Sequence, residues 1–226
     1  MIKLAMIPAR LGSQRLKQKN LREIHGAPII TWAIRKCVQA DVFDEIWVNS
    51  EADVFAEIAQ NEGVKFHRRP DELANNEATS EHYVYEFLTK HDCDYLFQVH
   101  SIAPLLTAEE VKGFAEAMVE GSHDVMLSCT LEQIECAMDG EPVNFTFEHK
   151  TNSQDLTPIQ RITWSISGWR SAVYKTAHEA ERVATYSGSV GFFPLDRLAG
   201  HIIKTEEDLE IAKALFSLRH GEARAG

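Results

Sequence analysis

The chain has 226 residues, of which 44% are hydrophobic, and a formal net charge of −11. This length is sufficient for one domain with a buried core. The acidic balance argues against a non-specific nucleic-acid binder, which needs a broad basic surface. The sequence contains no apolar run of the length, about 18 residues, that a transmembrane helix needs, so no membrane partner is expected.

The cysteines and the first residues bear on the compartment. The four cysteines show neither a CxxC spacing nor a disulfide framework, and are expected to be reduced thiols. The sequence begins with a strand-like segment, without a charged lead and a long apolar stretch before a cleavage site. A cytoplasmic location is the resulting prediction.

Apolar periodicity predicts strands that alternate with helices over the first 130 residues. The predicted strands are 3–8, 44–50, 64–69, 94–101 and 124–130. The predicted helices are 27–40, 52–63, 79–91 and 107–121, the last with Thr107 and Glu110 at capping-box spacing. This alternation predicts an α/β fold with a mostly parallel sheet, whose ligands bind beyond the carboxyl ends of the strands.

The alternation breaks after residue 130. The segment 143–149 is predicted to be an antiparallel strand, and 164–174 and 189–195 two further strands. A closing helix is predicted over 205–220, capped by Thr205 with Asp208 at its third position. Residues 221–226 are expected to be a disordered tail.

The first 22 residues form a local concentration of positive charge in an acidic protein. They contain no acidic residue and six basic ones: Lys3, Arg10, Arg15, Lys17, Lys19 and Arg22. Gly12 allows close approach of the backbone to an anion, and Arg10 stands at the end of the first strand. The spacing is neither that of a Walker A loop nor GxGxxG. Charge and glycine alone favour a phosphate-binding loop or, alternatively, a solvated basic loop.

The segment "IPARLGSQRLKQKNL" (7–21) resembles the signature IPARxGSKxxxxKN of the nonulosonate cytidylyltransferases. Weaker similarities follow in the same order along most of the chain. They are "GAPIITWAI" (26–34), "DEIWVNSE" (44–51), "RRPDELANNEATS" (68–80), "HSIAPLLTAEEV" (100–111) and "TEEDLEIAKAL" (205–215).

This resemblance implies a Rossmann-like nucleotidyltransferase fold, with a mixed, mostly parallel sheet flanked by helices. It implies one domain over 1–220, in which 131–165 is a small antiparallel dimerisation arm of a homodimer. The implied reaction transfers CMP from CTP to a 2-keto-3-deoxy sugar acid, sialic acid-like or Kdo-like, and releases pyrophosphate. Catalysis of this kind depends mostly on positioning and charge neutralisation.

The resemblance also assigns expected roles to individual residues. Arg10 and Lys19 are expected to be catalytic, acting on the reacting phosphates. The residues expected to bind the nucleotide are Ala9, Arg10, Gly12, Ser13, Lys19, Asn20, Arg69 and Ser80.

The chain departs from the family where a divalent cation, expected to be Mg²⁺, is usually bound. The family has an Asp-x-Asp pair before the closing helix, and Ile202 and Lys204 occupy those places here. Neither side chain offers the oxygen ligands that Mg²⁺ prefers. Lys204 could therefore take a catalytic part of the neutralising role. Alternatively, the metal is held by phosphates and waters, or by a carboxylate elsewhere, for which the candidates are Asp94, Asp196 and Glu206.

Residues on the acceptor side differ as well, which suggests an acceptor unlike sialic acid. His100 replaces a family glutamine and could bind the acceptor's carboxylate, act as a general base, or be only a hydrogen-bonded strand-end residue. Arg161 and Arg170 could each clamp a carboxylate or form a surface ion pair. Trp164 and Trp169 could stack on a sugar or line a dimer contact, although at least one is expected in the core.

Three functional hypotheses follow. The first is a cytidylyltransferase that joins CTP to a sugar acid. The second is a nucleotidyltransferase of the same fold that acts on another small acid or a phosphonate. The third is a nucleotide-binding protein of weakened activity, favoured by the absent carboxylates and opposed by the intact basic loop.

Overall fold

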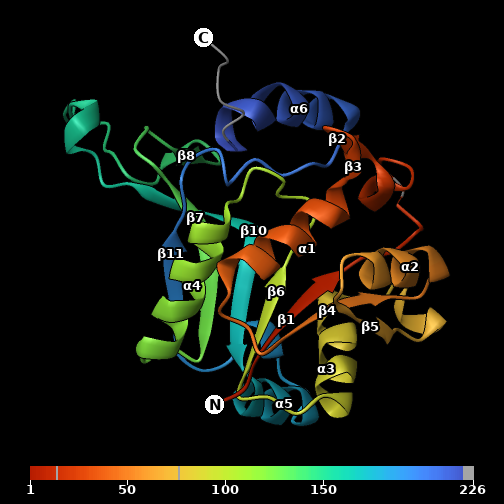
Figure 1. Cartoon of the computed structure of the whole chain (residues 1–226). Coiled ribbons are helices and arrows are strands. Elements are labelled where there is room, and N and C mark those ends of the chain that lie inside the picture. Colours follow the sequence, from red (N-terminus) through yellow and green to blue (C-terminus); the bar gives the residue numbers. More distant parts are fainter. Residues whose placement is uncertain (14, 76, 221–226) are drawn as a thin grey trace.

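A computed structural model of the chain describes residues 1–13, 15–75 and 77–220 (Figure 1). Its main sheet has seven strands in the order β11-β7-β10-β6-β1-β4-β5. They are β1 (Lys3–Pro8), β4 (Glu45–Ser50), β5 (Lys65–Arg68), β6 (Tyr95–Val99), β7 (Val125–Glu132), β10 (Ile159–Arg170) and β11 (Val190–Pro194). Strand β10 runs antiparallel to both neighbours, and every other pair in this sheet is parallel. The predicted mixed, mostly parallel sheet flanked by helices is thereby confirmed.

Helices cover both faces of the sheet. The first face carries α1 (Ile29–Ala40), α2 (Asp53–Asn61) and α4 (Ala108–Glu120), and the second carries α3 (Ser80–Lys90) and α5 (Ser171–Glu179). Strand β1 serves both layers, because alternate side chains of a strand point to opposite faces. Ala5 and Ile7 join the first hydrophobic cluster, and Leu4 and Met6 join the second.

Helix α6 (Glu206–His220) closes the fold above the C-terminal edge of the sheet (Figure 1). It packs on the hairpin of β2 (Glu23–Ile24) and β3 (Ala27–Pro28) through Ile24, Leu209 and Phe216. Within the described ranges, none of the helices is both long and apolar enough to cross a membrane.

The predicted helix caps are present. Thr107 and Glu110 form the reciprocal capping box at the start of α4. Thr205 Oγ1 accepts from Asp208 N at 3.2 Å, while Asp208 Oδ2 accepts from Thr205 N at 2.8 Å. These bonds join residues three apart in the sequence and set where the helices begin, so the sequence alone could predict them.

One predicted strand is absent and another differs in its bounds. Residues 143–149 form no strand, and the arm instead contains a short hairpin of β8 (Ala137–Met138) and β9 (Glu141–Pro142). Strand β10 ends at Arg170, four residues earlier than predicted, and α5 follows it at once. There Ser171 N donates to Asp94 O at 3.0 Å, so the chain leaves the sheet and buries Tyr174 and Ala177 as a helix. The predicted tail 221–226 lies outside the described residues.

The strand order indicates where a ligand is expected to bind. From β1 the chain moves outward to β4 and β5 on one side, and then to β6 on the other side of β1. Loops that follow strands on either side of such a reversal diverge and leave a crevice at the carboxyl edge. The loops after β1, β5 and β6 therefore converge on a common space.

Candidate active site

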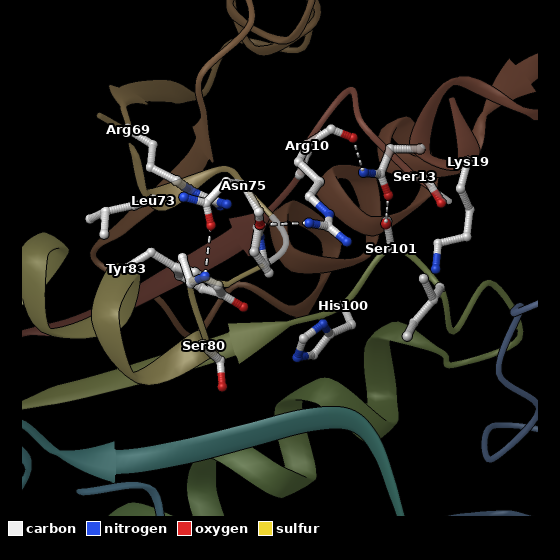
Figure 2. Close-up of a pocket in the computed structure, with 15 residues that line it drawn as sticks. Arg10, Ser13, Lys19, Arg69, Leu73, Asn75, Ser80, Tyr83, His100 and Ser101 are labelled. Atoms are coloured by element: carbon white, nitrogen blue, oxygen red, sulfur yellow. Dashed lines mark hydrogen bonds between the residues drawn. The ribbon is translucent and has the colours of Figure 1, made fainter. Parts of the chain in front are cut away.

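A cavity of about 320 Å³ lies at the carboxyl ends of β1, β5 and β6 and is called here the cationic cavity (Figure 2). Its lining residues are Pro8, Ala9, Arg10, Ser13, Lys19, Asn20, Arg69, Leu73, Asn75, Ala78, Ser80, Tyr83, His100, Ser101 and Ile102. Three of these side chains are cationic and none of them is a carboxylate. The cavity is therefore suited to an anionic ligand.

Asn20 connects the loop after β1 to the loop after β6 through hydrogen bonds to Arg10 and Ser101. The side chain is buried in the first turn of a 3₁₀ helix, η1 (Lys19–Leu21). Its Nδ2 donates to Arg10 O at 3.2 Å, and its Oδ1 accepts from Ser101 Oγ at 2.7 Å. Asn20 thus holds the backbone of Arg10 in place, a positioning role that motif similarity did not reveal.

Lys19 is a half-buried cation among other cations. Burial, followed by repulsion from Arg15, Arg10 and Lys204, lowers the pKa of Lys19 below its ordinary value. Of the described carboxylates, none forms an ion pair with it, and attraction to Asp208, which raises the pKa, is the smallest of these effects. A bound polyanion would relieve this repulsion, so the loop is electrostatically poised for one.

Arg69 forms a rigid cationic wall of the cavity, with 3% of its surface exposed. Its Nε donates to Asn49 Oδ1 at 2.6 Å and its Nη2 to Asn49 O at 2.8 Å. The guanidinium also lies 4.2 Å from the ring centroid of Tyr83, an attractive cation–π geometry. Burial lowers the pKa of Arg69, whose charge is nevertheless retained because arginine stays protonated in proteins.

His100 brings a neutral imidazole to the cavity, where its ring lies between Ser80 and Arg10 (Figure 2). Burial, with a contribution from Lys19, lowers the pKa of His100 to about 4. Its Nε2 is buried and has no hydrogen-bond partner among the described residues. A buried polar atom without a partner is costly, so a ligand group that pairs with Nε2 would be stabilised here.

Lys36 stabilises a turn that lines the cationic cavity, and the sequence patterns did not mark it as a site residue. It lies on α1 with 4% of its surface exposed, and its Nζ donates to Ala103 O at 2.8 Å and Pro104 O at 3.4 Å. Those carbonyls belong to the turn that carries Ser101 and Ile102. Burial lowers the pKa of Lys36 to about 7. A lysine on the apolar face of the predicted helix 27–40 was the available signal.

A second cavity of about 730 Å³ adjoins the first, and Ile102 lines both. Here called the acceptor cavity, it is lined by Ile102, Glu132, Arg161, Ile162, Thr163, Trp164, Arg197, Leu198, Gly200, His201, Ile202, Lys204, Asp208 and Leu215. It therefore combines an aromatic ring, apolar surface and several cationic groups.

An irregularity in β10 shapes the acceptor cavity. The register with β7 shifts between Ile162 and Ser167, and Trp164 adopts a positive φ of 57° there. Thr163 Oγ1 lies 2.9 Å from Ser128 Oγ, which fixes the bulged segment to β7. The opposite wall approaches closely, because a Cβ added to Gly200 would lie 2.5 Å from Thr130 Cγ2. The bulge thus turns Trp164 toward the cavity, consistent with the general use of bulges to re-aim side chains.

The structure brings most of the predicted site residues together. Eight of them line the cationic cavity: Ala9, Arg10, Ser13, Lys19, Asn20, Arg69, Ser80 and His100. Gly12 is not among the lining residues, and an added Cβ there would meet nothing within 4 Å. Arg161 and Lys204 line the acceptor cavity.

Arg170 was predicted to bind the acceptor, but the structure places it away from both cavities. It stands at the end of β10 that pairs with Tyr95, the first residue of β6, whereas the site lies beyond the last. Its Nε lies 3.6 Å from Asp124 Oδ1, and its guanidinium covers the Tyr95 ring. Because β10 runs antiparallel, its final residues reach the opposite edge of the sheet. Trp169, next to it, is buried in the core.

The donor set does not fit a divalent cation held by the protein. None of the three candidate carboxylates lines either cavity. Asp94 accepts from Ile2 N at 2.6 Å, Asp196 lies 3.5 Å from Arg219, and Glu206 pairs with Arg22. Across the described ranges, no cluster of three histidine, cysteine or acidic residues could hold a metal ion.

Comparison with known proteins supports the likeness seen in the sequence. A sequence profile of the family described as Cytidylyltransferase matches residues 4–190. The chain is 26% identical over 233 residues to a pseudaminic acid cytidylyltransferase of Campylobacter jejuni, covering 97% of this chain and 98% of that protein. It is 29% identical over 125 residues to N-acylneuraminate cytidylyltransferase A of Danio rerio, a match that spans only 29% of that longer protein.

A solved structure with the same fold is that of CMP:2-keto-3-deoxy-manno-octonic acid synthetase complexed with CTP. It superposes with a TM-score of 0.70 at 16% identity, covering 96% of this chain and 99% of that chain. At this level of identity the likeness concerns the fold alone.

Proposed function

Because this chain belongs to the cytidylyltransferase family, we propose that it transfers CMP from CTP to a nonulosonic or related 2-keto-3-deoxy sugar acid, with release of pyrophosphate. The observation that carries the proposal is a cavity lined by three cations and no carboxylate, joined at Ile102 to a larger cavity with its own cations. The first suits a triphosphate and the second an acidic sugar. The similarity to a pseudaminic acid enzyme over almost the full length of both proteins supports this acceptor class.

In this proposal the triphosphate occupies the cationic cavity beside Arg10 and Lys19. The acceptor's anomeric hydroxyl oxygen attacks the α-phosphorus of CTP, forming a new P–O bond while the bond to the β-phosphate oxygen breaks. Negative charge builds up on the departing pyrophosphate. Lys19, already repelled by its cationic neighbours, stabilises that charge more strongly than it stabilises the ground state.

His100 acts as a hydrogen-bond partner in this scheme. A group with a pKa near 4 is too weak a base to remove a hydroxyl proton efficiently at neutral pH. Its unpaired Nε2 is instead suited to pair with a polar group of the nucleotide or of the acceptor. The hydroxyl proton passes to solvent.

The acceptor cavity offers matching chemistry for a sugar acid. Arg161 lines it, although its Nε lies 3.1 Å from Glu132 Oε1, so binding of the acceptor's carboxylate would compete with that ion pair. Trp164 supplies an aromatic surface for the apolar face of a sugar ring. Arg161 and Trp164 are thus proposed to contact the acceptor.

The test is an assay of the full chain with CTP, Mg²⁺ and a panel of 2-keto-3-deoxy sugar acids, in which pyrophosphate and the CMP-sugar are both quantified. Lys19→Met is expected to lower kcat about 100-fold and to weaken CTP binding less than 10-fold. Lys17→Met is the matched control, because Lys17 lies in the same loop but is exposed and lines neither cavity.

The results separate the alternatives. Product from a sugar acid supports the proposal, and product only from another small acid or a phosphonate supports the second hypothesis. CTP binding without turnover on any acceptor would indicate a weakened nucleotide-binding protein. Equal loss of kcat and CTP affinity in Lys19→Met would limit Lys19 to ground-state binding.

A homodimer is part of the proposal. The arm that contains β8 and β9 extends away from the sheet (Figure 1). It carries several exposed apolar side chains. Met138 is 70% exposed and Phe147 73% exposed, and a second copy of the chain would remove such surface from water. Light scattering of the wild type and of Phe147→Asp tests this, with a dimer expected only for the wild type. The cytoplasmic location stays a prediction.

A further inference from the structure

The carboxylates near the two cavities are already engaged. The cationic cavity has no acidic residue in its lining, and the acceptor cavity has Glu132 and Asp208. Glu132 Oε1 accepts from Thr130 Oγ1 at 2.9 Å and from Arg161 Nε at 3.1 Å. Arg161 therefore already compensates the charge of Glu132, and across the described ranges no three acidic, histidine or cysteine side chains are grouped so that they could hold a metal ion.

Asp208 is committed to the start of α6. Its Oδ2 accepts from Lys204 N at 2.9 Å, from Thr205 N at 2.8 Å and from Thr205 Oγ1 at 2.9 Å. These bonds lower the pKa of Asp208 against the opposing effect of burial, so it stays ionised. They also fix the backbone of Lys204 at the rim of the acceptor cavity.

The cationic side chains near the two cavities differ from these carboxylates in their ion pairing. Arg15, Lys19 and Lys204 form no ion pair with any carboxylate in the described ranges. Lys19 and Lys204 line different cavities, yet each lies within the electrostatic field of the other. Two ammonium groups that line adjoining cavities and form no ion pair with a described carboxylate favour an anion between them and disfavour a divalent cation.

We infer that this chain neutralises the triphosphate with its own ammonium groups, Lys19 from one side and Lys204 from the other, so that nucleotide binding needs no divalent cation held by the protein. Ile202 and Lys204 stand where the sequence resemblance led us to expect two metal-binding aspartates. Ile202 packs partly against the hydrophobic core and offers no ligand atom. The inference rests on the proposed function, because it assumes that CTP occupies the cationic cavity.

The experiment is calorimetric titration of the full chain with CTP, once in excess EDTA and once in Mg²⁺. We expect the wild-type dissociation constants in the two buffers to agree within about 3-fold. Lys204→Gln is expected to weaken binding about 10-fold in EDTA. The matched control is Lys213→Gln, since Lys213 lies on α6 in an ion pair with Glu210 and outside both cavities.

A second variant replaces the two side chains at these positions by carboxylates. Ile202→Asp combined with Lys204→Asp is expected to make CTP binding depend on Mg²⁺ and to create a site for Mn²⁺ that electron paramagnetic resonance detects with CTP present. In the presence of CTP, the wild-type protein is expected to bind no more Mn²⁺ than the same concentration of CTP binds without protein. A wild-type affinity that falls 100-fold in EDTA, or an unchanged affinity in Lys204→Gln, would overturn the inference and leave the proposed function intact. Absence of CTP binding in both buffers would overturn both.

Discussion

Replacement of Lys36 by methionine is expected to change how the stability of the protein depends on pH. Lys36 is buried on α1, and its Nζ donates to Ala103 O and Pro104 O. These two carbonyls belong to the turn whose residues Ser101 and Ile102 line the cationic cavity. Burial lowers the pKa of Lys36 from its ordinary 10.5 to about 7 in the folded protein. Between these two values the unfolded chain binds a proton that the folded chain does not, so stability rises with pH.

The magnitude follows from the two pKa values. Each unit of difference is worth about 1.4 kcal/mol, so keeping Lys36 buried costs about 4 kcal/mol at pH 7 and about 2 kcal/mol at pH 9. The wild type should therefore gain about 2 kcal/mol over Lys36→Met between these pH values. The variant also loses two hydrogen bonds to carbonyl oxygens, a cost of about 1 kcal/mol each that depends little on pH.

Urea unfolding of both proteins at pH 7, 8 and 9 measures the difference directly. Lys112→Met is the matched control, because Lys112 is exposed on α4, where it forms an ion pair with Glu116. Its difference from the wild type should stay constant across this range. If the curves of the wild type and Lys36→Met are parallel, Lys36 keeps an ordinary pKa and the account of its burial fails.

Three further outcomes are expected. Asn20→Leu should raise the dissociation constant for CTP about 10-fold, since Arg10 and Ser101 lose their common anchor; calorimetry showing no change would contradict this. Thr107→Ala should lower the free energy of unfolding by about 1 kcal/mol in urea and leave CTP affinity unchanged, because it removes only a helix cap. Folded-state His100, with its pKa lowered to about 4, stays neutral while the unfolded chain takes up a proton, so stability falls as pH drops below 6.5. His100→Gln should reduce the loss between pH 6 and pH 5 by about 1 kcal/mol, and identical pH profiles would refute this assignment.

The cationic cavity gives a physical reason for a strongly basic loop in an acidic protein. Arg10, Lys19 and Arg69 come from loops after two different strands and face one space without a carboxylate. Such an arrangement destabilises the empty protein, because like charges repel and desolvated cations are costly. A triphosphate repays that cost on binding, which is the physical basis of the proposed activity.

Short-range features were determined by the sequence alone. The alternation of strands and helices, the caps at Thr107 and Thr205, and the cationic loop of 7–21 each depend on residues close in the chain. Hydrophobic period and local hydrogen bonds decide such features wherever the segment lies, so they could be predicted before the fold was known. The parallel sheet then followed from the alternation, and with it the edge at which the loops meet.

Contacts between distant segments were decided only by the tertiary structure. Lys36 meets Ala103 across 67 residues and Arg69 meets Asn49 across 20, and no local pattern marks either pair. The antiparallel course of β10 sends Arg170 to the far edge and leaves Arg161 near the site, although both residues looked equally suited to an acceptor. Strand direction and partner choice depend on how the whole core packs, which is why composition and spacing could not separate them.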